Sequence, residues 1–349
     1  MRLDETLPLN DIGHSSTSRW RILTTTLGPF LALMIVIVFF AACDHGMSYA
    51  KGGGRPATFL TLQNARLILV QTLTVAIAAL GMTLVIIAGG IDLSAGVAVS
   101  LSATVVAWCL RENHSPAVAV LAGLATGCAT GFLNGSLISL LRVVPFIVTL
   151  GTMRMFLGLG NLIAKETTLR PSPKSVPDWI PALVKPTPQP EWLVFSTGVW
   201  LLLGLAVVAS LLLRRTVFGR YIFAIGSNEA TARLCGVNVP WTKIAVYTAS
   251  GLFVGLAGVM QFARLSSGNP PSGVGLELRI IAAVVIGGGS LSGGRGSVLG
   301  TLTGAAIMQV LASGCTILGL PNPYQDIIVG VIVVVAVILD QVRQRRLEE

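Results

Sequence analysis

Charged residues are scarce in this sequence. Asp, Glu, Lys and Arg make up 11% of the 349 residues, whereas a soluble globular domain carries about 25%. Hydrophobic residues make up 53% of the chain, and the mean hydropathy is +0.79. A soluble enzyme is therefore excluded. Continuous apolar runs, such as Leu31 to Ala42, also exclude an outer-membrane barrel, because barrel strands alternate polar and apolar residues.

Recognisable catalytic and metal-binding motifs are also missing. The sequence has no GxxxxGKS/T phosphate loop, no HExxH and no GxSxG. Its three histidines (His14, His45 and His114) fall in tails or loops, and its five cysteines show no CxxC spacing. We therefore expect no catalytic residue, no metal site and no bound cofactor. Any ATP hydrolysis has to come from another protein.

Lys and Arg outnumber Asp and Glu by 24 to 15, which gives a net charge of +9. Basic residues could bind nucleic acid, but here they gather at the ends of apolar runs, as at Arg214, Arg215 and Arg343. No basic stripe is interleaved with aromatic residues, so we expect no nucleic-acid partner. The basic excess indicates membrane topology instead, because Lys and Arg accumulate in cytoplasmic loops.

The apolar runs predict an all-α polytopic membrane protein with about ten transmembrane helices, since one span needs about 20 mostly apolar residues. The positions of the basic residues and the even number of spans place both termini in the cytoplasm. The expected spans cover residues 22–43, 65–88, 94–110, 116–141, 145–164, 193–213, 242–264, 277–290, 298–320 and 325–340.

These spans form one transmembrane domain, residues 22–340, with cytoplasmic tails at 1–21 and 341–349. An outer loop is expected at 165–192 and a cytoplasmic loop at 214–241. The outer loop is rich in proline, which disfavours a regular helix and predicts an extended strap.

Two of the expected spans are irregular. The span 277–290 is short for a full crossing, and Gly89-Gly90-Ile91-Asp92 interrupts the chain between the second and third spans. Either one is interpreted as a broken or re-entrant segment.

Ionisable residues are rare within the spans, where each costs about 2.5–3.5 kcal/mol at a helix centre. Arg154 lies inside the fifth span, and Asp92, Glu277, Arg279 and Asp326 lie near span ends. The sequence thus offers no deep carboxylate for a proton relay, which disfavours proton-driven transport. Glu277 and Arg279 are interpreted as a boundary pair whose charges reach the headgroups.

Small residues mark the fourth span. Gly123, Gly127, Gly131 and Gly135 recur every four residues, a spacing that lets helix backbones approach closely. Asn134 lies in the same stripe, and its amide needs a hydrogen-bond partner in lipid. It either joins helices or lines a transport path, and the pattern does not separate the two.

The segment Thr216 to Pro240 predicts a short helix on the cytoplasmic surface. Ser227 or Asn228 can cap its first turn, Glu229 lies in that turn, and Gly236 ends the helix. Its small and apolar side chains could dock into a partner's groove. The alternative is a helix that only connects two spans.

Four sequence blocks are similar to motifs of one family. They are GIDLSAG at 90–96, GFLNG at 131–135 with PFIVTLGT at 145–152, the segment 219–237 with AIGSNEA, and the segment 277–301 with IAAVVIGG. Together they resemble the ribose-type permeases of ATP-binding cassette (ABC) importers, which carry monosaccharides and related small polar solutes. Arg279 departs from the family's pattern, in which many members carry Asp, and it reverses the local charge.

The resemblance implies a type II ABC importer-like permease in the bacterial inner membrane, surrounded by lipid. Its implied partners are an ABC ATPase subunit, a periplasmic solute-binding protein and a second permease chain, as a homodimer or a paralogous heterodimer. ATP-driven alternating access would then carry the solute. A stand-alone carrier or channel driven by a gradient is the alternative.

The resemblance and the polar residues of the spans together give two sets of candidate site residues. The residues expected to couple the chain to the ATPase are Gly219, Arg220, Gly226, Asn228, Glu229, Ala232, Arg233 and Gly236. The residues expected to line the translocation path are Asp92, Asn134, Thr149, Thr152, Glu277, Thr303 and Gln309.

Overall fold

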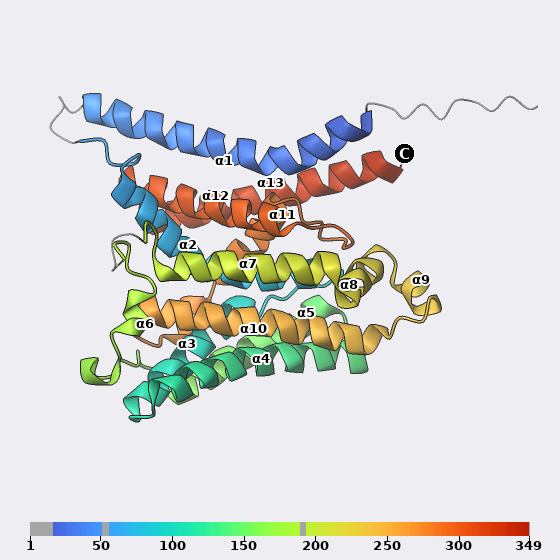
Figure 1. Ribbon diagram of the computed structural model, residues 1–349, viewed down its shortest axis with the longest axis horizontal. Coiled ribbons are helices and arrows are strands. Elements are labelled where there is room, and N and C mark those ends of the chain that lie inside the picture. Colours follow the sequence, from blue (N-terminus) through green and yellow to red (C-terminus); the bar gives the residue numbers. More distant parts are fainter. Residues whose placement is uncertain (1–16, 51–55, 189–192, 349) are drawn as a thin grey trace, which may run out of the picture.

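The computed structural model describes residues 17–50, 56–188 and 193–348, so most of the expected tail at 1–21 lies outside the described residues. Long helices run side by side in one bundle (Figure 1). Eight of the described helices are long and apolar enough to cross a membrane. They are α1 (Thr17–Ala50), α2 (Leu62–Ile87), α4 (Pro116–Leu140), α5 (Pro145–Ala164), α7 (Thr197–Arg215), α10 (Val239–Leu265), α12 (Val298–Ile317) and α13 (Asn322–Glu348).

Two shorter buried helices, α3 (Ala95–Arg111) and α11 (Leu276–Ile286), raise the number to the expected count of about ten. The interruption expected at Gly89–Asp92 is confirmed, because α2 ends at Ile87 and α3 begins at Ala95. The short span expected at 277–290 is shorter still. Its helix ends at Ile286, and Gly288 follows with a φ of +89°, a conformation that favours glycine.

Helix α2 lies at the centre of the bundle. Its residues are buried without a break from Thr72 to Ile87, as expected for a helix that is apolar on every side. Helices α7, α10, α11 and α12 pack around it. Helices α1 and α13 lie along one edge of the bundle (Figure 1) and are largely exposed, so their apolar surfaces suit contact with lipid.

The glycine stripe of α4 packs against α10. A Cβ atom on Gly127 would collide with the backbone of Gly251 and Gly255, and one on Gly131 would collide with the carbonyl oxygen of Tyr247. The two backbones therefore approach as closely as the glycine spacing predicts. This contact fixes α4, and with it Asn134, against the core.

The segment between α5 and α7 is not wholly extended. It contains a 3-10 turn at Pro173–Ser175 and a single helical turn, α6 (Trp179–Ala182), so the expectation of an extended strap is wrong there. The first turn of a helix tolerates Pro181, because the N–H that proline lacks would have no partner within the helix at this position. Ile180 is fully buried and anchors the segment. Residues 189–192 of the expected loop lie outside the described residues.

The close contact between α4 and α10 predicts opposite effects for two glycine-to-alanine changes. Gly131→Ala should lower the free energy of unfolding by about 1–3 kcal/mol, because the new methyl group forces the two helices apart. Gly204→Ala in α7, where a Cβ meets nothing within 4 Å, is the matched control and should not destabilise the protein. Thermal unfolding in detergent measures both, and equal midpoints would contradict the packing.

Candidate functional site

Two short helices connect α7 to α10: α8 (Val217–Ser227) and α9 (Glu229–Leu234). We call them and their flanking residues, 214–241, the coupling segment. The short helix expected here is confirmed. The side chain of Asn228 accepts a hydrogen bond from the backbone N–H of Thr231 at 2.9 Å and caps α9, and Gly236 follows the helix with a φ of +84°.

Helix α8 was not expected from the sequence. Its signals are present, however: Thr216 caps the helix through the N–H of Gly219, and Phe218, Ile222 and Ile225 recur at helical spacing. The turn into α8 also requires Gly219, because a Cβ there would collide with the carbonyl oxygens at the end of α7. Arg220 is exposed on α8.

Helix α9 is held on α10 by charge and by a small apolar core. Glu229 forms ion pairs with Lys243 at 2.7 Å and with Arg233 at 3.1 Å. The hydrogen bond from Lys243 holds the pKa of Glu229 below its ordinary value, although partial burial acts in the opposite direction. Ala232 packs in a core with Ile225, Val237 and Val239. These contacts tie α9 to the start of α10.

The outer surface of the coupling segment is apolar and has no cover within the described chain. Leu234 is 88% exposed and Trp241 is 66% exposed. An open cleft of about 500 Å³ beside Leu234 is lined also by Glu229, Ala230 and Arg233. Exposed large apolar side chains next to charged ones are typical of a protein interaction surface. This surface lies at the end of the bundle where α1 begins and α13 ends (Figure 1).

Glycines join the coupling segment to two breaks in the bundle. A Cβ atom on Gly226 would collide with the carbonyl oxygen of Ile87 at the end of α2. One on Gly293 would lie 2.6 Å from the carbonyl oxygen of Gly226 and 3.0 Å from the Cα of Gly89. The N–H of Gly294 donates to the carbonyl of Ile87 at 2.8 Å. We call this contact of three chain segments the glycine junction.

A second contact, deeper in the bundle, joins α3, α4 and α5. The carboxylate of Asp92 accepts hydrogen bonds from the backbone N–H of Ser94 at 2.9 Å and from its hydroxyl at 2.6 Å. The amide of Asn134 donates to the Ser94 hydroxyl at 2.8 Å, and its oxygen accepts from Thr152 at 2.7 Å. Thr149 donates to the carbonyl of Ile91 at 3.4 Å. We call this group the polar clamp.

The polar clamp accounts for four of the seven residues expected to line the path: Asp92, Asn134, Thr149 and Thr152. All four are buried and bond to one another or to neighbouring backbone, so Asn134 joins helices in this state. Asp92 follows the end of a span, as expected, and the surrounding helices bury its carboxylate.

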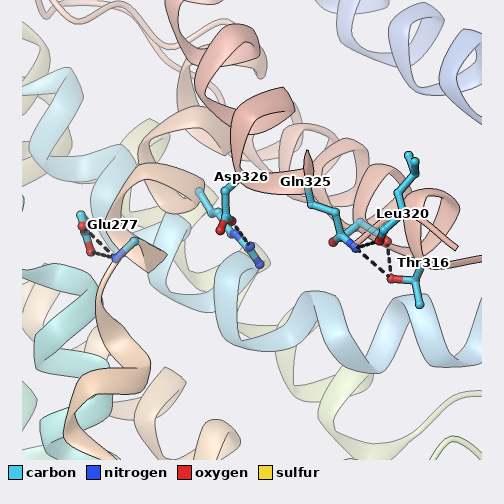
Figure 2. Close-up of polar contacts among 8 residues, drawn as sticks. Glu277, Thr316, Leu320, Gln325 and Asp326 are labelled. Atoms are coloured by element: carbon cyan, nitrogen blue, oxygen red, sulfur yellow. Dashed lines mark hydrogen bonds and ion pairs between the residues drawn. The ribbon is translucent and has the colours of Figure 1, made fainter. Parts of the chain in front are cut away.

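Glu277 and Arg279 do not form a boundary pair. Glu277 is buried, and its carboxylate accepts from the backbone N–H of Gly275 at 3.0 Å. Arg279 pairs instead with Asp326 at 3.2 Å, which ties α11 to the start of α13. Figure 2 shows Glu277 turned toward the backbone and, farther along, Gln325 reaching Leu320 and Thr316.

The two remaining path candidates lie on α12. Thr303 donates to the carbonyl of Leu299 in its own helix at 2.9 Å, and Gln309 donates to Gln71 of α2 at 2.6 Å. Neither shares a hydrogen bond with the polar clamp. Hydrogen bonds therefore do not join the seven candidates into one group. Within the described residues, no group of three or more His, Cys, Asp or Glu could hold a metal ion.

The bundle, its broken spans and its projecting coupling segment define a polytopic α-helical membrane transporter. A family model described as "Branched-chain amino acid transport system / permease component" matches residues 64–337. The chain belongs to this family, and it is therefore a transport permease and not an enzyme.

Several curated relatives are similar over most of their length. The ribose import permease protein RbsC of Escherichia coli (strain K12) is 40% identical over 289 residues, covering 82% of this chain and 88% of the relative. The fructose import permease protein FrcC of Rhizobium meliloti is 36% identical over 314 residues, 90% and 84% respectively. The L-arabinose ABC transporter permease protein AraH of Azospirillum brasilense is 34% identical over 288 residues, 82% and 83%. No solved structure gives a significant match.

The polar clamp predicts a specific cost for removing its central amide. Asn134→Ala should lower the free energy of unfolding by about 1–3 kcal/mol, because it leaves buried groups of Ser94 and Thr152 without their partner. Thr248→Ala is the control, since that hydroxyl donates only to Ile244 in its own helix. Thermal unfolding of the two purified variants compares them. An equal loss of stability in both variants would contradict a specific role of the polar clamp.

Proposed function

We propose that this chain is the membrane permease subunit of an ABC importer that carries a monosaccharide or a related small polar solute. One observation carries the proposal: the coupling segment presents Leu234 and Trp241 on a surface that the described chain leaves uncovered, beside two exposed ion-paired residues. Such a surface suits an ATPase partner. The names of the relatives, which mention ribose, fructose and L-arabinose, support the solute class.

The proposed location is the bacterial inner membrane, with the coupling segment and both tails, 1–21 and 341–349, in the cytoplasm. The basic residues of the coupling segment, Arg214, Arg215 and Arg220, favour this orientation. In Figure 1 the start of α1 and the end of α13 lie at the same end of the bundle as α8 and α9, which supports a common side for all of them. The loop at 165–192 would then be periplasmic.

The proposed assembly contains two ATPase subunits, a second permease chain and a periplasmic solute-binding protein. The second permease chain is either an identical copy or a paralogue. The exposed aliphatic side chains of α1, α7 and α13 would contact lipid or the second chain. The first discrimination between sugars would take place in the binding protein, before the solute enters the permease.

Coupling would begin when ATP binding moves the ATPase against α9. Because Glu229 fixes α9 to α10 through Lys243, the push would reach α10 directly. The glycine junction offers a second route, since Gly226 touches the end of α2 and the connection between α11 and α12. Packed backbones transmit displacement without slack, so both routes would help to switch access between the two sides of the membrane.

Uptake by the reconstituted complex tests the proposed function. The permease, ATPase and binding protein placed in one set of vesicles should accumulate radiolabelled ribose, fructose or L-arabinose only when ATP is supplied. Vesicles that contain only this chain should not accumulate sugar. Sugar uptake by the chain alone, without ATP, would instead establish a stand-alone carrier or channel.

The exposed tip of α9 predicts a mutation that separates insertion from coupling. Leu234→Asp should reduce co-purification of the ATPase at least about tenfold, because it places a charge in an apolar contact at a cost of more than 1.4 kcal/mol. The variant should still insert and fold, since Leu234 packs against little of its own chain. Val274→Asp, an exposed apolar position in another loop, is the control and should retain the ATPase. Normal ATPase binding by Leu234→Asp would place the docking surface elsewhere.

A further inference from the structure

Arg154 is a charged residue at the middle of a membrane span. It is the tenth of the 20 residues of α5, Pro145–Ala164. At a rise of 1.5 Å per residue, about 14 Å of helix separates it from either end. Lys and Arg reach the membrane surface by snorkelling when they lie near helix ends, and Arg154 is too deep for this.

The side chain of Arg154 points away from the rest of the bundle. Thr149, Thr152 and Phe156 form the buried side of α5. Arg154 follows Thr152 by two residues, which is about 200° around the helix, and it is exposed. Within the described residues it takes part in no hydrogen bond or ion pair.

Two glycines flank Arg154 on this face. Gly151 and Gly158, three residues before it and four after, lie on the same side of α5, and a Cβ on either would meet nothing within 4 Å. We call these three residues the Arg154 strip. Exposed apolar residues such as Leu150 continue this face of α5, as Val207 does on α7. What distinguishes the Arg154 strip from the exposed side of α7 is a charge at mid-span.

Within the described residues, a second copy of this chain offers no exposed carboxylate at mid-helix to neutralise Arg154. The buried carboxylates Asp44, Asp92 and Glu277 already bond within their own chain. The exposed acids of the described chain lie in loops or near helix ends: Glu112, Glu166, Asp178 and Asp326. Lipid does not suit the guanidinium either, because a charge at the bilayer centre is strongly unfavourable. The remaining environment is water.

We propose that the Arg154 strip lines the aqueous solute path and that Arg154 is a specificity-determining residue that donates hydrogen bonds to oxygen atoms of the passing solute. Guanidinium is a fixed donor array, and it binds oxygen atoms of hydroxyl or carboxylate groups. The proposal rests on the proposed transport function, but the position of the strip is tested without transport. The proposal also assigns different roles to the two sides of α5: one side lines the path, and the other belongs to the polar clamp.

Cysteine labelling in inverted and right-side-out membrane vesicles containing the complete transporter tests the position of the strip. The five native cysteines are first replaced by alanine, and Arg154→Cys and Val207→Cys are made separately in that background. Val207, midway along α7 and exposed, is the lipid-facing control. Gly158→Cys is the second reporter of the strip if Arg154→Cys fails to insert.

We expect a membrane-impermeant cationic thiosulfonate to modify Cys at 154 at least about tenfold faster than Cys at 207, because ionised thiol and charged reagent both need water. Excess sugar should slow the reaction at 154 only. Equal, slow reaction at both positions would place the strip in lipid, and resistance at 154 to both charged and apolar reagents would place it in a protein contact. Either result overturns the proposal and leaves ATP-dependent uptake untouched.

Uptake kinetics test the specificity role. Arg154→Met should raise the KM for sugar about tenfold, as expected when one hydrogen bond to a charged group is lost. Arg154→Lys, which keeps the charge and some of the donors, should restore most of this loss. If the KM of the Arg154→Met variant is unchanged while the strip remains accessible to the charged reagent, Arg154 has no role in specificity.

Discussion

The chain breaks after α2 and after α11 where both helices meet the coupling segment, and the buried backbone groups at these breaks have to find partners without bulk water. An unpaired backbone group in hydrocarbon costs several kcal/mol. At the break after α2, the carbonyl of Ile87 accepts from Gly294, and Asp92 accepts from the backbone of Ser94. Backbone groups at a break thus form hydrogen bonds with residues of other chain segments. The glycine junction and the polar clamp both result from this requirement, and the coupling segment packs against the first of them.

The sequence was sufficient to predict the spans and the short helix α9, because a long apolar run and a capping Asn228 are local signals. It was not sufficient to predict burial. Asp92 and Glu277 were expected near the surface because they lie close to span ends, and only the three-dimensional arrangement shows that these ends lie inside the bundle. The same limit applies to Gly226, whose close approach to Ile87 joins residues far apart in the chain. Helix α8 was missed although its apolar spacing was readable.

Helix α5 connects these features because its two sides have different environments. Thr149 binds Ile91 in the α2–α3 break, Thr152 binds Asn134 of α4, and Arg154 lies on the opposite side of the same helix. A helix of 20 residues behaves as a rigid rod over this length. A displacement at the break would therefore turn or shift the Arg154 side by a similar amount. The hydrogen bonds of Thr149 and Thr152 would thus fix the position of Arg154 and also transmit a displacement to it.

Among the described helices, α1 packs almost only on α12, where the ring of Phe40 lies against Gly314. The chain between these two residues is about 270 residues long, and translation at about 5–20 residues per second takes roughly 15–50 seconds to make it. During this time α1 is already in the membrane without its partner. Its largely apolar surface allows α1 to remain in lipid as a single helix. The order of synthesis therefore requires α1 to be stable in lipid before the rest of the bundle has formed.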